Sequence, residues 1–255
     1  MTLKAEAIVE VSGLNVHFSG KTVLEVISLS LRPGEITVIV GPSGSGKTTL
    51  LRSLNRLNEC FPDCHTEGAV RLRLDGRSGD IYHNFLSLPE LRRRVGMVFQ
   101  TPAVLPFSIW KNLAMPLQVA LGLTGAALRE RGEKALRDVS LWEEVKDRLD
   151  DAAATLSGGQ QQRLCLARVL ALEPRILLLD EPTASLDFRA AARIEELLLE
   201  LKDRYTILAV SHSLSETRRL ADRVLVLREG RIVQELDRQH LSDPALFQQL
   251  IEAAF

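Results

Sequence analysis

A run of glycines and hydroxyl residues around one lysine has the chemistry to bind phosphate groups. It follows the apolar segment Val38–Val40 and contains the pattern G-x-x-x-x-G-K-T. Glycines let successive backbone N–H groups turn toward one anion, and a helix that begins near Lys47 adds the positive end of its dipole. In such a loop Lys47 reaches the β- and γ-phosphates and the Thr48 hydroxyl ligates Mg²⁺. The predicted nucleoside triphosphate site comprises Gly41, Pro42, Ser43, Gly44, Ser45, Gly46, Lys47, Thr48 and Thr49.

Two carboxylates follow a second apolar segment. Ile176–Leu179 leads directly into Asp180 and Glu181. Open α/β sheets bind ligands at the carboxyl ends of their strands, so we expect both carboxylates to lie beside the phosphate loop. Asp180 is then placed to orient the shell of a Mg²⁺ ion, through water, and Glu181 to accept a hydrogen bond from an attacking water as general base or water-positioner.

The elements that must position these residues alternate between strands and helices, which predicts a parallel α/β sheet. Helical periodicity replaces the strand signal from Ser108 to about Arg148, with a break at Gly122–Gly125. We expect one nucleotide-binding domain over residues 1–255 with a helical subdomain inserted at about 101–164. The phosphate loop should lead into a helix reaching Asn58, and Asp237–Phe255 should form one amphipathic helix. Expected strands cover Ile8–Val11, Leu14–Phe18, Val23–Leu31, Glu35–Val40, Ala69–Leu74, Val95–Phe99, Arg175–Asp180, Thr206–Val210, Arg223–Leu227 and Arg231–Leu236.

Composition narrows the class of protein. The 255 residues include 32 Lys and Arg against 33 Asp and Glu, and this balance argues against a nucleic-acid partner. No apolar run approaches the ~18–20 residues that span a bilayer, and the N-terminus lacks a signal-peptide pattern. Three cysteines suggest a reducing compartment, so we expect a cytoplasmic protein. Cys60, Cys64 and His65 lack a fourth ligand at zinc spacing, and we expect loop thiols there.

A second glycine motif, Leu156-Ser157-Gly158-Gly159-Gln160, precedes a helix for which Ser157 is a natural N-cap. The pentapeptide resembles the signature of ATP-binding-cassette (ABC) ATPases. That resemblance implies a P-loop NTPase (RecA-like) α/β fold: a parallel sheet core, an antiparallel β layer and an inserted α-helical subdomain. It also implies that Leu156, Ser157, Gly158, Gly159 and Gln160 cover an ATP held by the phosphate loop of a partner subunit.

The same resemblance assigns roles to residues that the motifs alone leave open. Gln100 matches the family's Q-loop glutamine, which touches Mg²⁺ and water and senses a membrane partner. His212 matches the histidine that contacts the γ-phosphate. Phe18, with His17 as the reserve candidate, takes the place of the aromatic residue that stacks on adenine. Asp187 should reach across a dimer interface, although the preceding Ala184-Ser185 inverts the family's usual order, so Ser185 receives no role.

Several functions remain open at this point. The resemblance favours an ATPase that drives a membrane transporter through separate permease subunits, as a homodimer or a pair of ABC subunits at the inner face of the membrane. The segment Pro106–Trp110 would dock a partner helix or pack in the helical core. ABC ATPases of DNA repair or translation are disfavoured, because this chain has one cassette and no sustained heptads. Segments 51–59, 91–102 and 106–112 resemble phosphate-importer ATPases, which work with a solute-binding protein. Residues 101–106 and the tail depart from them, so another oxyanion, an amino acid or an exported substrate stays open.

Overall fold

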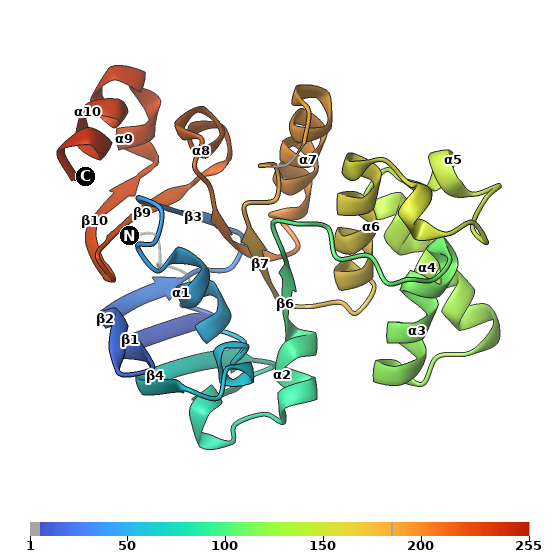
Figure 1. Ribbon diagram of the computed structural model, residues 1–255, viewed down its shortest axis with the longest axis horizontal. Helices are drawn as coiled ribbons and strands as arrows, with labels where there is room; N and C mark the ends of the chain where they lie inside the picture. Colours follow the sequence, from blue (N-terminus) through green and yellow to red (C-terminus); the bar gives the residue numbers. More distant parts are fainter. Residues whose placement is uncertain (1–5, 185, 255) are drawn as a thin grey trace.

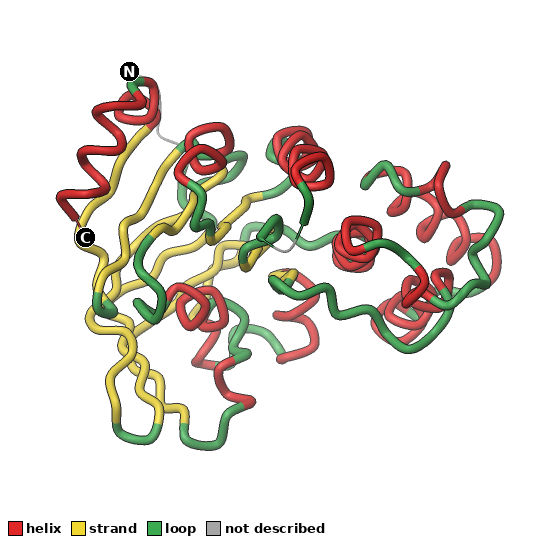
Figure 2. The backbone as a smooth tube through the Cα atoms, turned by 45° about the horizontal axis from the view of Figure 1, so that its top comes forward, coloured by secondary structure: helices red, strands yellow, loops and turns green. Residues whose placement is uncertain are grey.

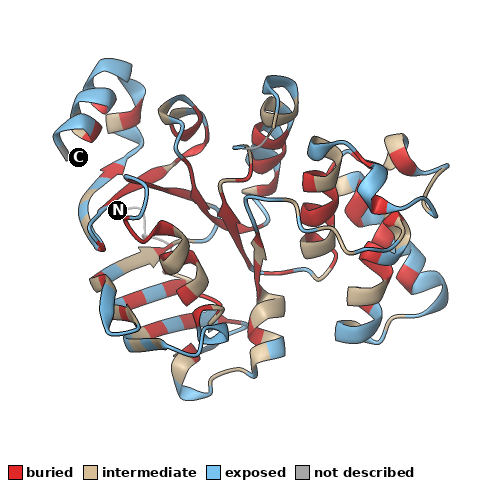
Figure 3. Ribbon diagram, viewed as in Figure 1, coloured by how far each residue is buried: buried red, intermediate tan, exposed pale blue. Residues whose placement is uncertain are grey.

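A six-stranded sheet lies at the centre of the molecule, and its inner strands are buried on both faces (Figures 1 and 3). The computed structural model describes residues 6–184 and 186–254. In β3, Ile36, Val38 and Val40 enter one hydrophobic core and Ile39 enters another. A strand buried on both sides needs a continuous apolar run, which explains why the sequence indicated these strands. From edge to edge the sheet contains β10 (Arg231–Asp237), β9 (Arg223–Arg228), β3 (Ile36–Val40), β8 (Thr206–Val210), β7 (Ile176–Asp180) and β6 (Val95–Val98).

The parallel arrangement expected for this sheet is confirmed, with one antiparallel pair at its edge. The neighbouring pairs from β9 to β6 are parallel, and β10 returns antiparallel to β9. Because the strands are parallel, the segments that follow β3, β7 and β8 all leave the sheet at the same end, where the carboxyl ends of these strands lie. Helices cover both faces of the sheet (Figure 2).

A four-stranded antiparallel sheet, in the order β2–β1–β4–β5, packs on one side of this core. The strands expected at Ile8–Val11 and Leu14–Phe18 are one strand, interrupted by a register shift between Val11 and Leu14. This sheet consists of β1 (Val9–Phe18), β2 (Lys21–Leu31), β4 (Cys64–Leu74) and β5 (Arg77–Asp80).

The helix after the phosphate loop is shorter than expected. Helix α1 covers Lys47–Ser53 rather than continuing to Asn58. Arg56 adopts a left-handed φ of 57°, and the Leu57 N–H donates to the Arg52 carbonyl at 2.9 Å. This is the hydrogen bond of a Schellman-type helix end, so the backbone turns away and η1 (Asn58–Cys60) follows.

The helical block between β6 and β7 is confirmed, as is its break at Gly122–Gly125. Gly122 caps α3 with a left-handed φ of 64°. Apolar residues of the block belong to the same core as one face of the central sheet, so its limits at 101–164 stay a prediction. The block contains α3 (Ile109–Leu121), α4 (Gly125–Asp138), α5 (Trp142–Val145), η3 (Ala153–Thr155) and α6 (Gly158–Leu170).

The tail forms two helices where one was expected. Asp243 is extended because it precedes Pro244, and its carboxylate accepts hydrogen bonds from the Ala245 and Leu246 N–H groups. Phe247 and Ile251 are buried in the main core. The remaining helices are η2 (Ile81–His83), α2 (Leu88–Arg94), α7 (Phe188–Leu201), α8 (Leu214–Leu220), α9 (Arg238–Ser242) and α10 (Pro244–Ala254).

Candidate active site

The phosphate loop connects β3 to α1 and is held by close backbone packing. A Cβ at Gly41 would lie 2.0 Å from the Leu227 carbonyl oxygen, and one at Gly46 would lie 2.8 Å from Leu24 Cδ2. Gly46 also has a φ of 103°, which L side chains rarely adopt. The Gly230 N–H donates to the Ser45 carbonyl at 3.1 Å. The antiparallel sheet and the β9–β10 turn therefore fix the shape of the loop.

Two side chains of this loop are buried in a way that suits an anion. Lys47 Nζ donates to the carbonyl oxygens of Gly41 at 2.9 Å and Pro42 at 2.8 Å. Burial lowers the pKa of the Lys47 ammonium, while the Glu181 and Asp180 carboxylates oppose that change. The Ser45 hydroxyl is buried without a hydrogen-bond partner. A buried polar group of this kind costs free energy unless something pairs with it, so Ser45 Oγ is available to a phosphate oxygen.

Asp180 lies beside the phosphate loop, as the strand order predicts. Thr48 Oγ1 donates to Asp180 Oδ1 at 3.0 Å, which joins the start of α1 to the end of β7. Burial raises the pKa of Asp180; the Thr48 hydrogen bond lowers it and the Glu181 charge raises it. A buried carboxylate oxygen next to a hydroxyl offers the hard oxygen donors that Mg²⁺ prefers. The residues present therefore fit such an ion.

Two residues from distant parts of the chain contact the carboxylate of Glu181. Gln100 Nε2 donates to Glu181 Oε2 at 3.1 Å, and His212 Nε2 lies 2.7 Å from Glu181 Oε1. Glu181 itself has a left-handed φ of 49°, and its N–H donates to the Val210 carbonyl at 3.2 Å. A non-glycine residue in that region costs free energy and persists where the surroundings hold it. The strained turn directs Glu181 between the ends of β6 and β8.

The signature motif begins α6 with a capping box. Ser157 Oγ accepts from the Gln160 N–H at 3.3 Å, and Gln160 Oε1 accepts from the Ser157 N–H at 2.9 Å. The Gln160 amide also donates to Glu144 at 2.9 Å. Glu144 accepts a bidentate pair of bonds from the buried Arg163, whose hydrogen bond lowers the pKa of Glu144. The motif is thus rigidly anchored within the helical block.

The structure does not bring the signature to the phosphate loop of the same chain. Helix α6 packs against β6 and α7, whereas α1 packs against β2, β7 and β8. Figures 1 and 2 show α6 and α1 on different sides of the β6 edge.

Asp187 caps α7 by accepting from the Arg189 and Ala190 N–H groups at 2.9 and 3.0 Å. The neighbouring Ser185 lies outside the described residues.

Phe18 ends β1 and is partly buried against the antiparallel sheet's core. Its ring meets that of Phe61 edge-on, with centroids 5.8 Å apart, and Arg52 of α1 lies over the Phe61 ring. The position of Phe61 beside Phe18 was not predicted from the sequence, because no motif marks the loop that contains Phe61. His17 pairs instead with His65, the two rings being stacked at 6.4 Å.

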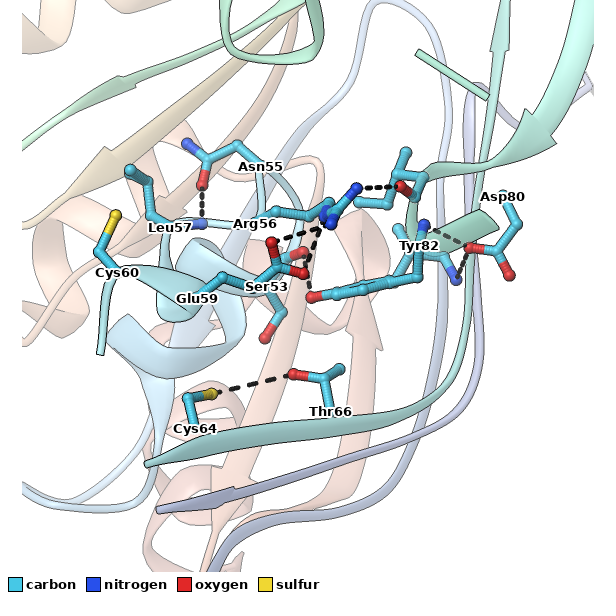
Figure 4. Close-up of polar contacts among 12 residues, drawn as sticks. Ser53, Asn55, Arg56, Leu57, Glu59, Cys60, Cys64, Thr66, Asp80 and Tyr82 are labelled. Atoms are coloured by element: carbon cyan, nitrogen blue, oxygen red, sulfur yellow. Dashed lines mark hydrogen bonds and ion pairs between the residues drawn. The ribbon is translucent and has the colours of Figure 1, made fainter. Parts of the chain in front are cut away.

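The two cysteines of this region do not both lie in a loop, which corrects the expectation. Cys60 belongs to η1 and Cys64 begins β4 (Figure 4). Cys64 Sγ faces Thr66 Oγ1 at 3.9 Å, whereas Arg92 Nη2 approaches Cys60 Sγ at 3.8 Å. Tyr82 packs nearby and donates to the Ser53 carbonyl, and burial raises its pKa to about 12. Among residues 6–184 and 186–254, no group of His, Cys, Asp and Glu could hold a metal ion by itself.

Pro106–Trp110 leads into α3, and Trp110 packs against α4. A Cβ at Gly132 would lie 2.5 Å from the Trp110 ring. Trp110 also lines a cavity of about 330 Å³ together with Trp142 and Arg148. Throughout the described part of the chain, no helix is long and apolar enough to cross a bilayer.

Comparison with known proteins agrees with this geometry. The pattern of the ABC transporter family matches residues 24–184. A phosphate import ATP-binding protein of Streptococcus pneumoniae is 45% identical over 240 residues, which are 94% of each chain. The cbiO1 structure from Clostridium perfringens, part of an ABC transporter complex, has a TM-score of 0.80 and 27% identity, with 97% of this chain and 95% of that one covered. A dimeric ATP-binding cassette bound to ADP and Pi has a TM-score of 0.74 and 30% identity, with 90% and 98% covered.

Proposed function

The chain belongs to the ABC transporter family as an ATP-hydrolysing subunit, and on that premise we propose that it powers phosphate import. The proposal for the cargo rests on the 45% identity to the phosphate import ATP-binding protein of Streptococcus pneumoniae across almost the whole of both chains. That degree of likeness extends well beyond the shared ATP-binding motifs.

ATP is bound, in this proposal, by the phosphate loop and stacked at its base by Phe18. Backbone N–H groups from Gly41 to Thr49 and the start of α1 hold the phosphates, and Lys47 exchanges its carbonyl partners for phosphate oxygens. The buried Ser45 hydroxyl supplies a further donor. Thr48, Asp180 and Gln100 would hold Mg²⁺, with Asp180 acting through water. When bound, the ion neutralises charge that develops on the phosphates.

Glu181 is the residue that acts on the attacking water. Its carboxylate accepts a hydrogen bond from the water and positions it, or takes its proton. The water oxygen then bonds to the γ-phosphorus as the bond from that phosphorus to the bridging oxygen breaks, and ADP leaves with that oxygen. His212, 2.7 Å from Glu181 Oε1, is close enough to hold that carboxylate and to donate to a γ-phosphate oxygen. Gln100 contacts the same carboxylate and transmits a change in the position of Glu181 to the segment that precedes α3.

Two copies of the chain form the working unit in this proposal. The separation of α6 from α1 leaves the Leu156–Gln160 motif without a nucleotide in its own chain. A head-to-tail pair uses the same surface twice and places each signature on the partner's ATP. Hydrolysis removes the γ-phosphate contacts and reopens the pair, which then moves permease subunits at the inner face of the membrane. Import also requires a solute-binding protein outside the membrane.

The observation that carries the proposed chemistry is the convergence of Gln100, His212 and the phosphate loop on Asp180 and Glu181 at the end of β7. The test of the cargo is uptake of radiolabelled phosphate by phosphate-starved cells of the source organism. A chromosomal Lys47→Ala strain should lose this uptake and still accumulate an unrelated amino acid normally. Normal phosphate uptake in that strain would refute phosphate as the cargo, while loss of ATPase activity in the purified variant would show that the motor assignment still holds.

A further inference from the structure

A buried carboxylate on α8 joins the two segments that carry Glu181 and His212. Glu216 is only 4% exposed. Its Oε1 accepts from Thr183 Oγ1 at 2.8 Å, and its Oε2 accepts from Ser211 Oγ at 2.5 Å. Thr183 lies two residues after Glu181, and Ser211 lies immediately before His212. The Glu216 side chain therefore connects the segment that carries Glu181 to the segment that carries His212.

The local sequence would have assigned Glu216 a different task. Ser213-x-x-Glu216 has the pattern of a capping box, in which the glutamate turns back to the N–H of the capping residue. Ser213 does cap α8, since its Oγ accepts from the Glu216 N–H at 3.2 Å. The Ser213 N–H, however, donates to Ser211 Oγ at 3.0 Å, so the Glu216 carboxylate is free to point into the protein.

Burying this carboxylate is costly, and its two hydrogen bonds offset only part of that cost. The stability of α8 does not need it, because Ser213 already caps the helix and Arg219 ties α8 to Glu195 of α7 at 2.6 and 2.7 Å. Each bond of Glu216 instead ends on a loop that leaves the sheet beside the phosphate site. The position therefore favours a role in the geometry of those loops.

We propose that Glu216 is a positioning residue for ATP hydrolysis, which holds the Thr183 and Ser211 segments in register so that the Glu181 carboxylate stays against His212. The inference rests on the proposed roles of Glu181 and His212. Glu181 directly follows the end of β7 in a strained φ, and His212 lies two residues beyond the end of β8. With Ser211 also bonded through its N–H to the Ile39 carbonyl of β3, Glu216 links both loops to the strand that enters the phosphate loop.

The test compares Glu216→Ala with Glu216→Gln in the purified full-length protein. Glu216→Ala should lower kcat by about 10- to 100-fold, the loss expected when a catalytic group is misplaced by about 1 Å. Its affinity for ATP, measured by calorimetry, should stay within about twofold of wild type, because Glu216 lies behind the site. Glu216→Gln should recover most of kcat, since the Thr183 and Ser211 hydroxyls can donate to or accept from an amide.

Two further comparisons separate positioning from stability. Glu195→Ala removes the other buried carboxylate between α7 and α8, and it should lower the melting temperature while kcat stays near wild type. Thr183→Val with Ser211→Ala deletes both hydrogen bonds to the Glu216 carboxylate, and this pair should lower kcat by the same factor of about 10 to 100. It also keeps the inference testable if Glu216→Ala fails to fold.

Wild-type kcat in the Thr183→Val, Ser211→Ala pair would overturn the inference. So would an equal loss of kcat in Glu216→Ala, Glu216→Gln and Glu195→Ala, since that would reflect stability alone. Glu181→Gln, assayed alongside, keeps the two levels apart. If it turns over ATP normally, the proposed role of Glu181 fails; if it is inactive while Glu216→Ala is normal, only the positioning role fails.

Discussion

The Glu181 carboxylate lies between the Gln100 amide and the His212 imidazole at the end of β7. Substitution of Glu181 therefore tests whether this carboxylate acts in hydrolysis. Glu181→Gln keeps the side chain's size and an amide oxygen that can accept from Gln100, but it removes the charged acceptor. We expect ATP binding to persist and kcat to fall by about 10²- to 10⁴-fold, the range typical of a lost general base. Phosphate release measures turnover, and size-exclusion chromatography with ATP should show accumulated dimer. Glu196→Gln, an exposed residue of α7, is the matched control and should leave turnover unchanged.

The raised pKa of Asp180 gives a second residue-scale prediction. Burial makes the charged form less favourable in the folded protein than in the unfolded chain, so stability is lost as pH rises from 3.8 through the raised folded pKa. Asp180→Asn removes that charge and keeps an acceptor for Thr48. At pH 8 we expect its melting temperature to exceed wild type by about 2–4 °C, roughly 1 kcal/mol, with hydrolysis abolished.

The control for this pH dependence is Asp75→Asn. The Arg94 guanidinium holds the pKa of the exposed Asp75 below its usual value, so its contribution has the opposite sign and is lost on acidification. Circular dichroism melts from below pH 3.8, the ordinary pKa of an aspartate, up to pH 8 check both variants. A constant difference between Asp180→Asn and wild type over this range would contradict the burial argument.

The packing of helix α3 against helix α4 can be tested by a substitution at their contact. Gly132 lies inside α4, where alanine would normally favour the helix by about 1 kcal/mol. Here a Cβ would meet the Trp110 ring at 2.5 Å, so Gly132→Ala should instead destabilise the protein by about 1–3 kcal/mol through overpacking. Urea denaturation measures the change. Adding Trp110→Leu should recover part of the loss, and additive effects of the two substitutions would show that they do not share this contact.

The relation between the two nucleotide motifs can be tested only in the whole molecule. Lys47→Ala should lose ATP at its phosphate loop, and Ser157→Arg should block the exposed start of α6; each alone should be inactive. In a mixed dimer, the intact loop of one chain meets the intact signature of the other. Equal mixing should restore about a quarter of wild-type ATPase activity, because half the dimers are mixed and each retains one complete site. Absence of any recovery, with mixed dimers demonstrated by tagged pull-down, would contradict the shared site.

Much of the fold followed from the sequence because its signals are local. The phosphate loop, the carboxylates after Ile176–Leu179 and the capped start of α6 are each contiguous, so residue types alone predicted their structures. Continuous apolar runs predicted the buried strands for the same reason. Local signals were weaker at element ends: the left-handed Arg56 and the extended Asp243 were missed, and with them the short α1 and the divided tail.

Only the tertiary structure decided which distant residues meet. Gln100, Glu181 and His212 follow three different strands, and their contact depends on the order β8–β7–β6, which no local pattern specifies. The separation of α6 from α1 arises from the packing of the helical block against β6, and it keeps the signature away from the phosphate loop of its own chain. Glu216 carries a capping pattern, yet its carboxylate bonds to Thr183 and Ser211 because folding places those hydroxyls beside it. Sequence thus determined the chemical groups and their elements, whereas long-range strand pairing and side-chain packing determined their convergence.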